Sequence, residues 1–177
     1  MKQDGRAFDV IGQLANLRRY ARSLVRNAVD AEDLVHDALV RAYERRSTYK
    51  SGMGLRRWLL AIVHNTHIDR VRSAMARGRR DETIALEVDE AYPAQQELNV
   101  RLAQVRRAFL TLPEEQREAL HLVAVEDLSY QEAADILGIP VGTLMSRVSR
   151  ARAALREYEN GAAKPSHLRL IEGGGND

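Results

Sequence analysis

Apolar residues recur every three or four positions along the first half of the chain, which is the spacing of helices that each bury one face. Asp30 is a good cap for the second of these helices, and Glu32 and Asp33 in its first turn suit the helix dipole. A loop at residues 47–54 precedes the third helix. We expect the three helices to form one small bundle. They are predicted at about 10–25, 30–44 and 55–76.

The second half of the chain continues the helical pattern. One helix is expected from about residue 98 to 112, and Pro113 is expected to open the next, which runs to about Ala124. No alternating pattern of a strand persists in the sequence, so the predicted fold class is all-α, with two small helical bundles. The predicted boundaries are an amino-terminal arm at 1–9, a first domain at 10–80, a flexible acidic linker at 81–97, a second domain at 98–158 and a flexible tail at 159–177.

Residues 128–155 predict a helix-turn-helix. Ser129 and Glu132 have the spacing of a capping box, in which each side chain satisfies an amide at the start of a helix. Gly138 can adopt the positive φ that ends a helix, and Pro140 starts a new element without an amide donor. These features together predict two short helices joined by a tight turn.

The second of these helices has one apolar face and one cationic face. Residues 136–156 contain four arginines and no acid. Such a face can meet phosphates and guanine edges in a major groove of DNA. The alternative is an amphipathic helix whose basic face is only solvated. The residues predicted to contact DNA are Thr143, Ser146, Arg147, Ser149, Arg150 and Arg152.

Composition narrows the class of protein. The chain has 177 residues, of which 45% are hydrophobic and 29% charged, as in ordinary globular proteins. No apolar run approaches the ~20 residues of a membrane span and no signal peptide is visible, so we expect a cytoplasmic protein without membrane insertion. The absence of cysteine excludes disulfides and thiolate metal sites.

The net charge is only +2, but its distribution is polarised. Residues 41–80 contain eleven Lys or Arg against two acids, whereas residues 81–100 contain six acids and no base. A basic stretch beside an acidic one is typical of a nucleic-acid surface next to a solvated linker.

Nothing in the sequence indicates catalysis or a cofactor. No nucleophile elbow, phosphate-binding glycine loop or pair of carboxylates in an apolar setting is present, so an enzyme is not expected. His64 and His67 lie three apart on one helical face, which is compatible with a metal pair. No acid or thiol of suitable spacing completes such a site, so we expect no metal.

Four segments give the chain a resemblance to a known family: 30–44, 56–72, 112–152 and the acidic stretch 81–97. In order and spacing they resemble the extracytoplasmic-function sigma factors, the smallest members of the bacterial sigma-70 class. The resemblance covers residues of about 10 to 158. It implies a first domain that binds the β′ clamp helices of core RNA polymerase and opens the minus-ten element. It also implies a second domain that reads the minus-thirty-five element beside the β flap.

The resemblance assigns roles to residues of the first domain. Glu32, Asp33, Leu34 and Asp37 match the polymerase-binding segment, although a capped helix with a solvated face explains the same acids. Trp58 shares a stripe with Leu55, which favours a place in the core over base stacking. The residues matched to minus-ten DNA are Tyr49, Lys50, Met53, Arg56, Arg57, Trp58, Asn65, His67 and Arg72.

Two positions depart from the family pattern. Met145 stands where a lysine or arginine is common, and Pro140 stands where a serine or threonine often caps the helix. Since Arg147 and Arg150 are retained, we expect DNA binding with an altered sequence preference.

The resemblance leaves competing functions to test. We expect an alternative sigma factor, controlled by an anti-sigma factor that clamps the two domains together. One alternative is a sigma mimic that binds an anti-sigma factor without binding a promoter. Another is a repressor that uses only the helix-turn-helix, but it leaves the segments at 30–72 unexplained. Core polymerase binding together with promoter DNA binding would separate these three.

Overall fold

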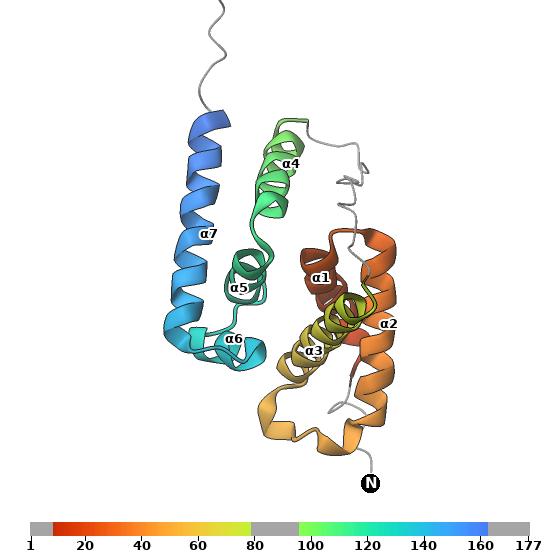
Figure 1. The fold of residues 1–177 in the computed structure, drawn as a ribbon. Coiled ribbons are helices and arrows are strands. Elements are labelled where there is room, and N and C mark those ends of the chain that lie inside the picture. The colour runs from red at the N-terminus through yellow and green to blue at the C-terminus, as the bar shows by residue number, and fades with distance from the viewer. Residues whose placement is uncertain (1–8, 79–95, 163–177) are drawn as a thin grey trace, which may run out of the picture.

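The computed structural model describes residues 9–78 and 96–162, and within these ranges the chain is helical, without strands. The all-α prediction is therefore confirmed. Figure 1 shows two groups of helices lying side by side. The first group contains α1 (Leu14–Val25), α2 (Ala28–Glu44) and α3 (Leu55–Ala76), and the second contains α4 (Gln96–Thr111), α5 (Glu114–Ala124), α6 (Tyr130–Leu137) and α7 (Val141–Ala162). Short 3-10 helices occupy Ile11–Gln13, Arg46–Thr48 and Ser51–Met53.

The first group, here called the first unit, forms a three-helix bundle around the apolar faces that the periodicity predicted. Leu17, Leu59 and Val63 are almost completely buried at its centre. The cap of α2 was predicted at the wrong residue. Asn27, not Asp30, accepts hydrogen bonds through Oδ1, from the amides of Val29 at 2.8 Å and Asp30 at 3.2 Å. Asn27 has the extended backbone of a cap, so α2 begins two residues earlier than expected.

The second group, the second unit, begins and ends its helices largely where the sequence indicated. Pro113 occupies the cap position of α5, and α5 ends at Ala124. Leu144, Val148 and Ala151 on α7 are almost completely buried, as the apolar stripe predicted. However, α7 continues to Ala162, so the first residues of the predicted flexible tail are helical instead.

Three predicted segments lie mainly outside the described residues. They are the amino-terminal arm, most of the acidic linker and the tail beyond residue 162. The predicted linker overlaps α4 at residues 96 and 97, because α4 begins at Gln96. Along the parts of the chain that the structure describes, no helix is long and apolar enough to cross a bilayer.

The two units pack directly against each other. Helix α5 lies beside α1, and α6 lies beside α3 (Figure 1). The buried apolar residues of the two units belong to one continuous cluster, which runs from Leu17 in α1 to Ala151 in α7. The sequence predicted separate bundles that can pack together or separate, and the structure presents the packed arrangement.

Candidate functional site

The turn between α6 and α7 has the geometry of a helix-turn-helix. The Ser129 hydroxyl accepts from the Glu132 amide at 3.2 Å, and the Glu132 carboxylate accepts from the Ser129 amide at 3.0 Å, so the capping box is complete. Hydrogen bonds from the amide and the hydroxyl of Ser129 lower the pKa of the Glu132 carboxyl. Gly138 ends α6 with a φ of 63°, a conformation that favours glycine. These local features fix the angle at which α7 leaves α6.

Helix α7 presents most of its predicted DNA-contacting residues to solvent. Thr143, Ser149, Arg150 and Arg152 are exposed, while Ser146 and Arg147 are half-buried. A cleft of about 400 Å³ lies between the start of α7 and α5, and both exposed and half-buried members of the face line it. The face is therefore accessible at four of the six positions and partly covered at Ser146 and Arg147. The cleft is lined by Glu115, Gln116, Gly142, Thr143, Ser146, Arg147 and Arg150.

Arg147 is the one member of this face with a carboxylate partner among the described residues. Its Nη2 lies 3.0 Å from Oε2 of Glu115 on α5. Glu115 is largely exposed, so this ion pair is weak and screened by solvent. A DNA phosphate or guanine edge that uses Arg147 must first displace Glu115.

The predicted polymerase-contacting segment lies on α2, but Leu34, the apolar residue predicted for this contact, is not at the surface. Leu34 is fully buried among the core residues of the first unit, because it faces α1 and α3. Asp33 and Asp37 are exposed, and Arg70 of α3 pairs with Asp37 at 2.5 Å. Glu32 pairs with Arg18 at 2.9 Å. The surface at these positions consists of acids and their arginine partners.

A second, outward stripe on α2 was missed by the sequence analysis. Val29, Val40 and Tyr43 are 70%, 47% and 66% exposed, and His36 is exposed between them. Together with Asp33 they follow steps of four and three residues, so they share one face of the helix. The spacing of these residues is visible in the sequence, but only the inward apolar stripe of this helix was predicted.

The residues matched to minus-ten DNA differ in exposure. Four are exposed, three are half-buried and two are buried. In that order they are Lys50, Met53, Asn65 and Arg72; Tyr49, Arg56 and Arg57; and Trp58 and His67. The Trp58 ring lies 5.4 Å from that of Tyr49, so it packs in the core, as its stripe favoured, and is not an open stacking platform. His67 is turned toward the second unit, where its Nε2 lies 2.7 Å from Oε1 of Glu114.

Arg56 and Arg57 at the start of α3 are partly covered by carboxylates of the second unit. Arg57 Nη1 lies 3.1 Å from Glu132, and Arg56 Nη1 lies 3.9 Å from Glu126. Glu126 is fully buried and also lies 3.3 Å from Arg19 of α1. Arg57 is therefore hydrogen-bonded to an acid of the other unit, and Arg56 lies near one without a hydrogen bond.

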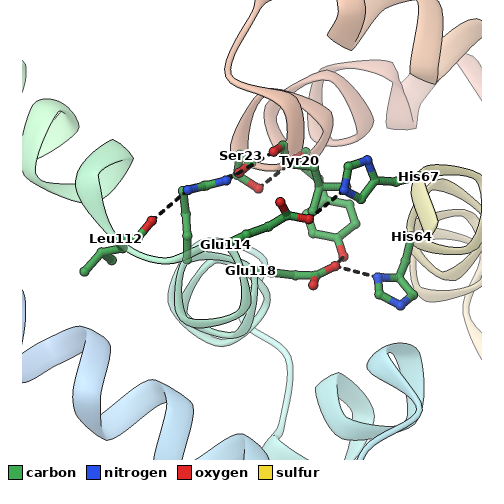
Figure 2. Close-up of polar contacts among 9 residues, drawn as sticks. Tyr20, Ser23, His64, His67, Leu112, Glu114 and Glu118 are labelled. Atoms are coloured by element: carbon green, nitrogen blue, oxygen red, sulfur yellow. Dashed lines mark hydrogen bonds and ion pairs between the residues drawn. The ribbon is translucent and has the colours of Figure 1, made fainter. Parts of the chain in front are cut away.

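A buried polar contact joins α5 to α1, and the sequence analysis did not find it. The Arg117 guanidinium, 1% exposed, donates to the carbonyls of Ser23 and, at 3.1 Å, Leu24 (Figure 2). These carbonyls lie in the last turn of α1, where a helix leaves acceptors unpaired and its dipole favours a cation. Burial, and then the nearby Arg26, lowers the pKa of Arg117 to about 10, so it remains charged at neutral pH.

Beside Arg117, Glu118 of α5 meets two side chains of the first unit. The Tyr20 hydroxyl donates to Glu118 Oε1 at 2.6 Å, and His64 Nδ1 lies 2.5 Å from the same oxygen (Figure 2). Burial, followed by the Glu118 charge, raises the pKa of the Tyr20 hydroxyl. All three side chains are buried, so the contact specifies how the two units fit together.

His64 and His67 therefore turn to two different glutamates. In the described residues, no group of three or more His, Cys, Asp or Glu side chains is arranged to hold a metal ion. The sequence carried one signal for the buried polar contact between the units, namely the polar stripe along α5. Its members Glu114, Arg117 and Glu118 recur at helical spacing.

Comparison with known protein families gives one match in each unit. Residues 13–77 match the model of sigma-70 region 2, and residues 102–155 match that of sigma-70 region 4. The ECF RNA polymerase sigma factor EcfG of Rhodopseudomonas palustris is 36% identical over 87% of this chain and 86% of its own length. The chain belongs to the extracytoplasmic-function sigma factors of the sigma-70 family.

Two solved structures are similar over most of this chain. The sigma factor RpoE of Bartonella quintana, solved with the anti-sigma factor NepR, has a TM-score of 0.72 and 31% identity, covering 89% of this chain and 98% of RpoE. CnrH, solved with the cytosolic domain of CnrY, has a TM-score of 0.61 and 28% identity, covering 89% of this chain and 90% of CnrH.

Proposed function

We propose that this sigma factor binds core RNA polymerase through its first unit and recognises the minus-thirty-five promoter element through α7. The observation that carries the proposal is the exposed, acid-free face of α7, set by a complete capping box and a glycine turn. Helices of this kind enter the major groove with their amino-terminal residues against base edges. Thr143 and Arg150 are the best placed, since both are exposed and line the cleft.

The minus-ten strand is assigned to the loop at residues 49–53 and the start of α3. Lys50 and Met53 are exposed there, and Arg56 and Arg57 supply cations for phosphates. Strand opening needs such cations beside groups that receive unstacked bases. This assignment requires the acids that now pair with Arg56 and Arg57 to move away.

The polymerase contact is assigned to the outward stripe of α2. An exposed helix face with Val40 and Tyr43 toward its carboxyl end and Asp33 earlier along it suits docking against another helix. Leu34 is not part of this surface, since its removal would instead leave a cavity in the core.

A charge placed on this stripe provides a direct test. Asp33→Arg together with Val40→Asp should weaken binding to purified core polymerase by roughly tenfold or more, since an apolar contact and a complementary charge are both lost. Surface plasmon resonance would measure the affinity. Val105→Asp on α4 is the control for the Val40→Asp change, because Val105 is 60% exposed and lies in the second unit. Equal weakening by the control, or normal affinity of the double variant, would contradict the assignment.

We also propose control by an anti-sigma factor. Support comes from RpoE and CnrH, whose solved structures contain NepR and a domain of CnrY. A decoy that only binds an anti-sigma factor would not need the accessible arginines of α7. Run-off transcription with core polymerase and promoter DNA separates the functions, since a decoy or a repressor gives no specific transcript.

A further inference from the structure

An exposed methionine lies within the cationic face of α7. Leu144 and Val148 of the inward stripe are buried, whereas Met145 is 54% exposed. Of the large apolar side chains described on α7, only Met145 and Tyr158 are exposed, and Tyr158 lies near the opposite end of the helix. Met145 is the fifth residue of α7, in the amino-terminal part that contacts base edges in a helix-turn-helix. It thus adds an apolar group to the surface proposed to face DNA.

The exposed face of α7 has two sides with different neighbours. Thr143, Arg147 and Arg150 line the cleft beside α5, and Glu115 on the opposite wall of this cleft pairs with Arg147. Met145 is not among the residues that line the cleft. The carboxylate that competes for Arg147 therefore does not lie against Met145.

Met145 lies on the other side of the face, toward α6. Residues four and seven apart share one side of a helix, so Ser149 and Arg152 lie on the same side as Met145. Arg152 Nη1 lies 3.5 Å from the hydroxyl of Tyr130 on α6. Ser149 and Arg152 are exposed. This side thus combines one apolar group with a hydroxyl and a cation, and all three are open to a ligand.

We propose that Met145 determines specificity by packing against the C5-methyl group of a thymine in the minus-thirty-five element. Among the four bases, thymine alone carries a methyl group on its major-groove edge, and apolar side chains recognise it by contact. The thioether side chain is flexible and polarizable, so it can follow such a surface closely. The inference rests on the proposed function, which assigns α7 to this element.

A contact to phosphate does not explain an exposed methionine. Phosphate oxygens accept hydrogen bonds from cations and from other donors, and the methionine side chain has neither a charge nor a donor. A lysine or arginine, common at this position in the family, would contact phosphate in any sequence. At Met145, a contact that is the same for all sequences is thus replaced by one that depends on a single methyl group.

Removing one methyl group at a time tests the contact. The full-length chain first selects a duplex from a randomised pool. Each thymine of the selected duplex is then replaced by deoxyuridine, which lacks only the C5-methyl group. At one thymine, this replacement should weaken binding about fourfold, the effect of one buried methyl group. Fluorescence anisotropy measures the affinities, and replacement at the distant thymines should have little effect.

Met145→Ala should remove the dependence on that methyl group. The variant should bind the thymine and deoxyuridine duplexes equally, because the side chain that senses the difference is gone. Alanine favours helix, so the circular dichroism of the variant should be unchanged. Met75→Ala is the matched control, since Met75 is 72% exposed on α3 and lies outside the proposed surface. The control should keep the fourfold difference.

Met145→Arg exchanges the apolar contact for a cation at the same place. It should strengthen binding to all duplexes and increase the salt slope by about one, as for one added phosphate contact. The fourfold preference for thymine over deoxyuridine should disappear. Retention of this preference in Met145→Arg would overturn the inference.

The same measurements separate failure of the inference from failure of the proposed function. If the pool yields no preferred sequence, or if neither Arg150→Ala nor Met145→Arg changes duplex binding, α7 does not read DNA and both fail. If Arg150→Ala weakens binding but no deoxyuridine replacement does, only the inference is overturned. The inference is also overturned if Met145→Ala keeps the fourfold difference, or if Met75→Ala loses it equally.

Discussion

The two cationic surfaces of this sigma factor differ in what faces them. On α7, Arg150 is exposed, and Arg147 alone has a carboxylate partner within residues 9–78 and 96–162. At the start of α3, Arg56 and Arg57 both face acids of the other unit. The helix proposed to read duplex DNA is thus accessible, while the surface proposed for single-stranded DNA is partly covered. Arginines on the two helices therefore differ in accessibility because of the side chains packed around them.

The contact between the units combines apolar and polar side chains. The buried apolar residues of both units form one continuous cluster, and several polar side chains are buried beside it. Arg117 and Glu118 are two of these, and their hydrogen bonds reach α1. Their removal is therefore expected to have the largest effect.

Replacing Arg117 tests the contact that joins the two units, and should have the largest effect. Arg117→Ala leaves the carbonyls at the end of α1 without their donor, and should lower the free energy of unfolding by about 3 kcal/mol, as when a buried charged partner is lost. Urea denaturation measures the change. Arg107→Ala on α4 is the control, since Arg107 is exposed and its loss should matter little. Similar destabilisation in both variants would mean that Arg117 does not join the units.

Replacing single arginines of α7 tests whether this accessible surface contacts bases or only phosphates. Arg150→Ala should cost about 1–3 kcal/mol on a matched minus-thirty-five duplex and relax preference at one base, if its contact is bidentate to guanine. A contact to phosphate alone would weaken binding to all sequences and lower the salt slope by about one. Arg147→Ala should cost less, because Arg147 must first leave Glu115. Fluorescence anisotropy at two salt concentrations measures both.

Glu115→Gln is the matched variant for this series. It removes the competitor of Arg147 and should raise duplex affinity modestly, with no effect in the Arg147→Ala background. Unchanged affinity, specificity and salt dependence in both arginine variants would show that α7 does not read DNA.

The smallest expected effect is on the pH dependence of stability. The hydrogen bond from His67 lowers the pKa of Glu114 from its usual 4.5, against the opposing effect of burial. A carboxyl with a lowered folded pKa stabilises the protein above its unfolded pKa, and this contribution is lost as the pH falls through the folded value. Wild type should therefore lose its advantage over Glu114→Gln as the pH falls below about 4.5.

The advantage itself should be below about 1 kcal/mol, because Glu114 is half-exposed and solvent screens the pair. Urea denaturation of both proteins over a pH series provides the measurement. A difference that stays constant as the pH falls would contradict the linkage, and would place the effect of the substitution outside this ion pair.

The sequence determined the features that depend on near neighbours in the chain. The capping box of Ser129 and Glu132, the glycine turn at Gly138 and the extent of α3 follow from residues three or four positions apart. Their physical basis is local, since caps and positive φ need no distant partner. The exposed arginines of α7 follow in the same way, because the apolar stripe of the helix fixes its opposite face.

Only the tertiary structure decided which polar residues are buried between the units. Periodicity identifies one apolar face of α5 and leaves the other to solvent by default. Arg117 and Glu118 lie instead against α1 and α3, where distant acceptors and donors satisfy them.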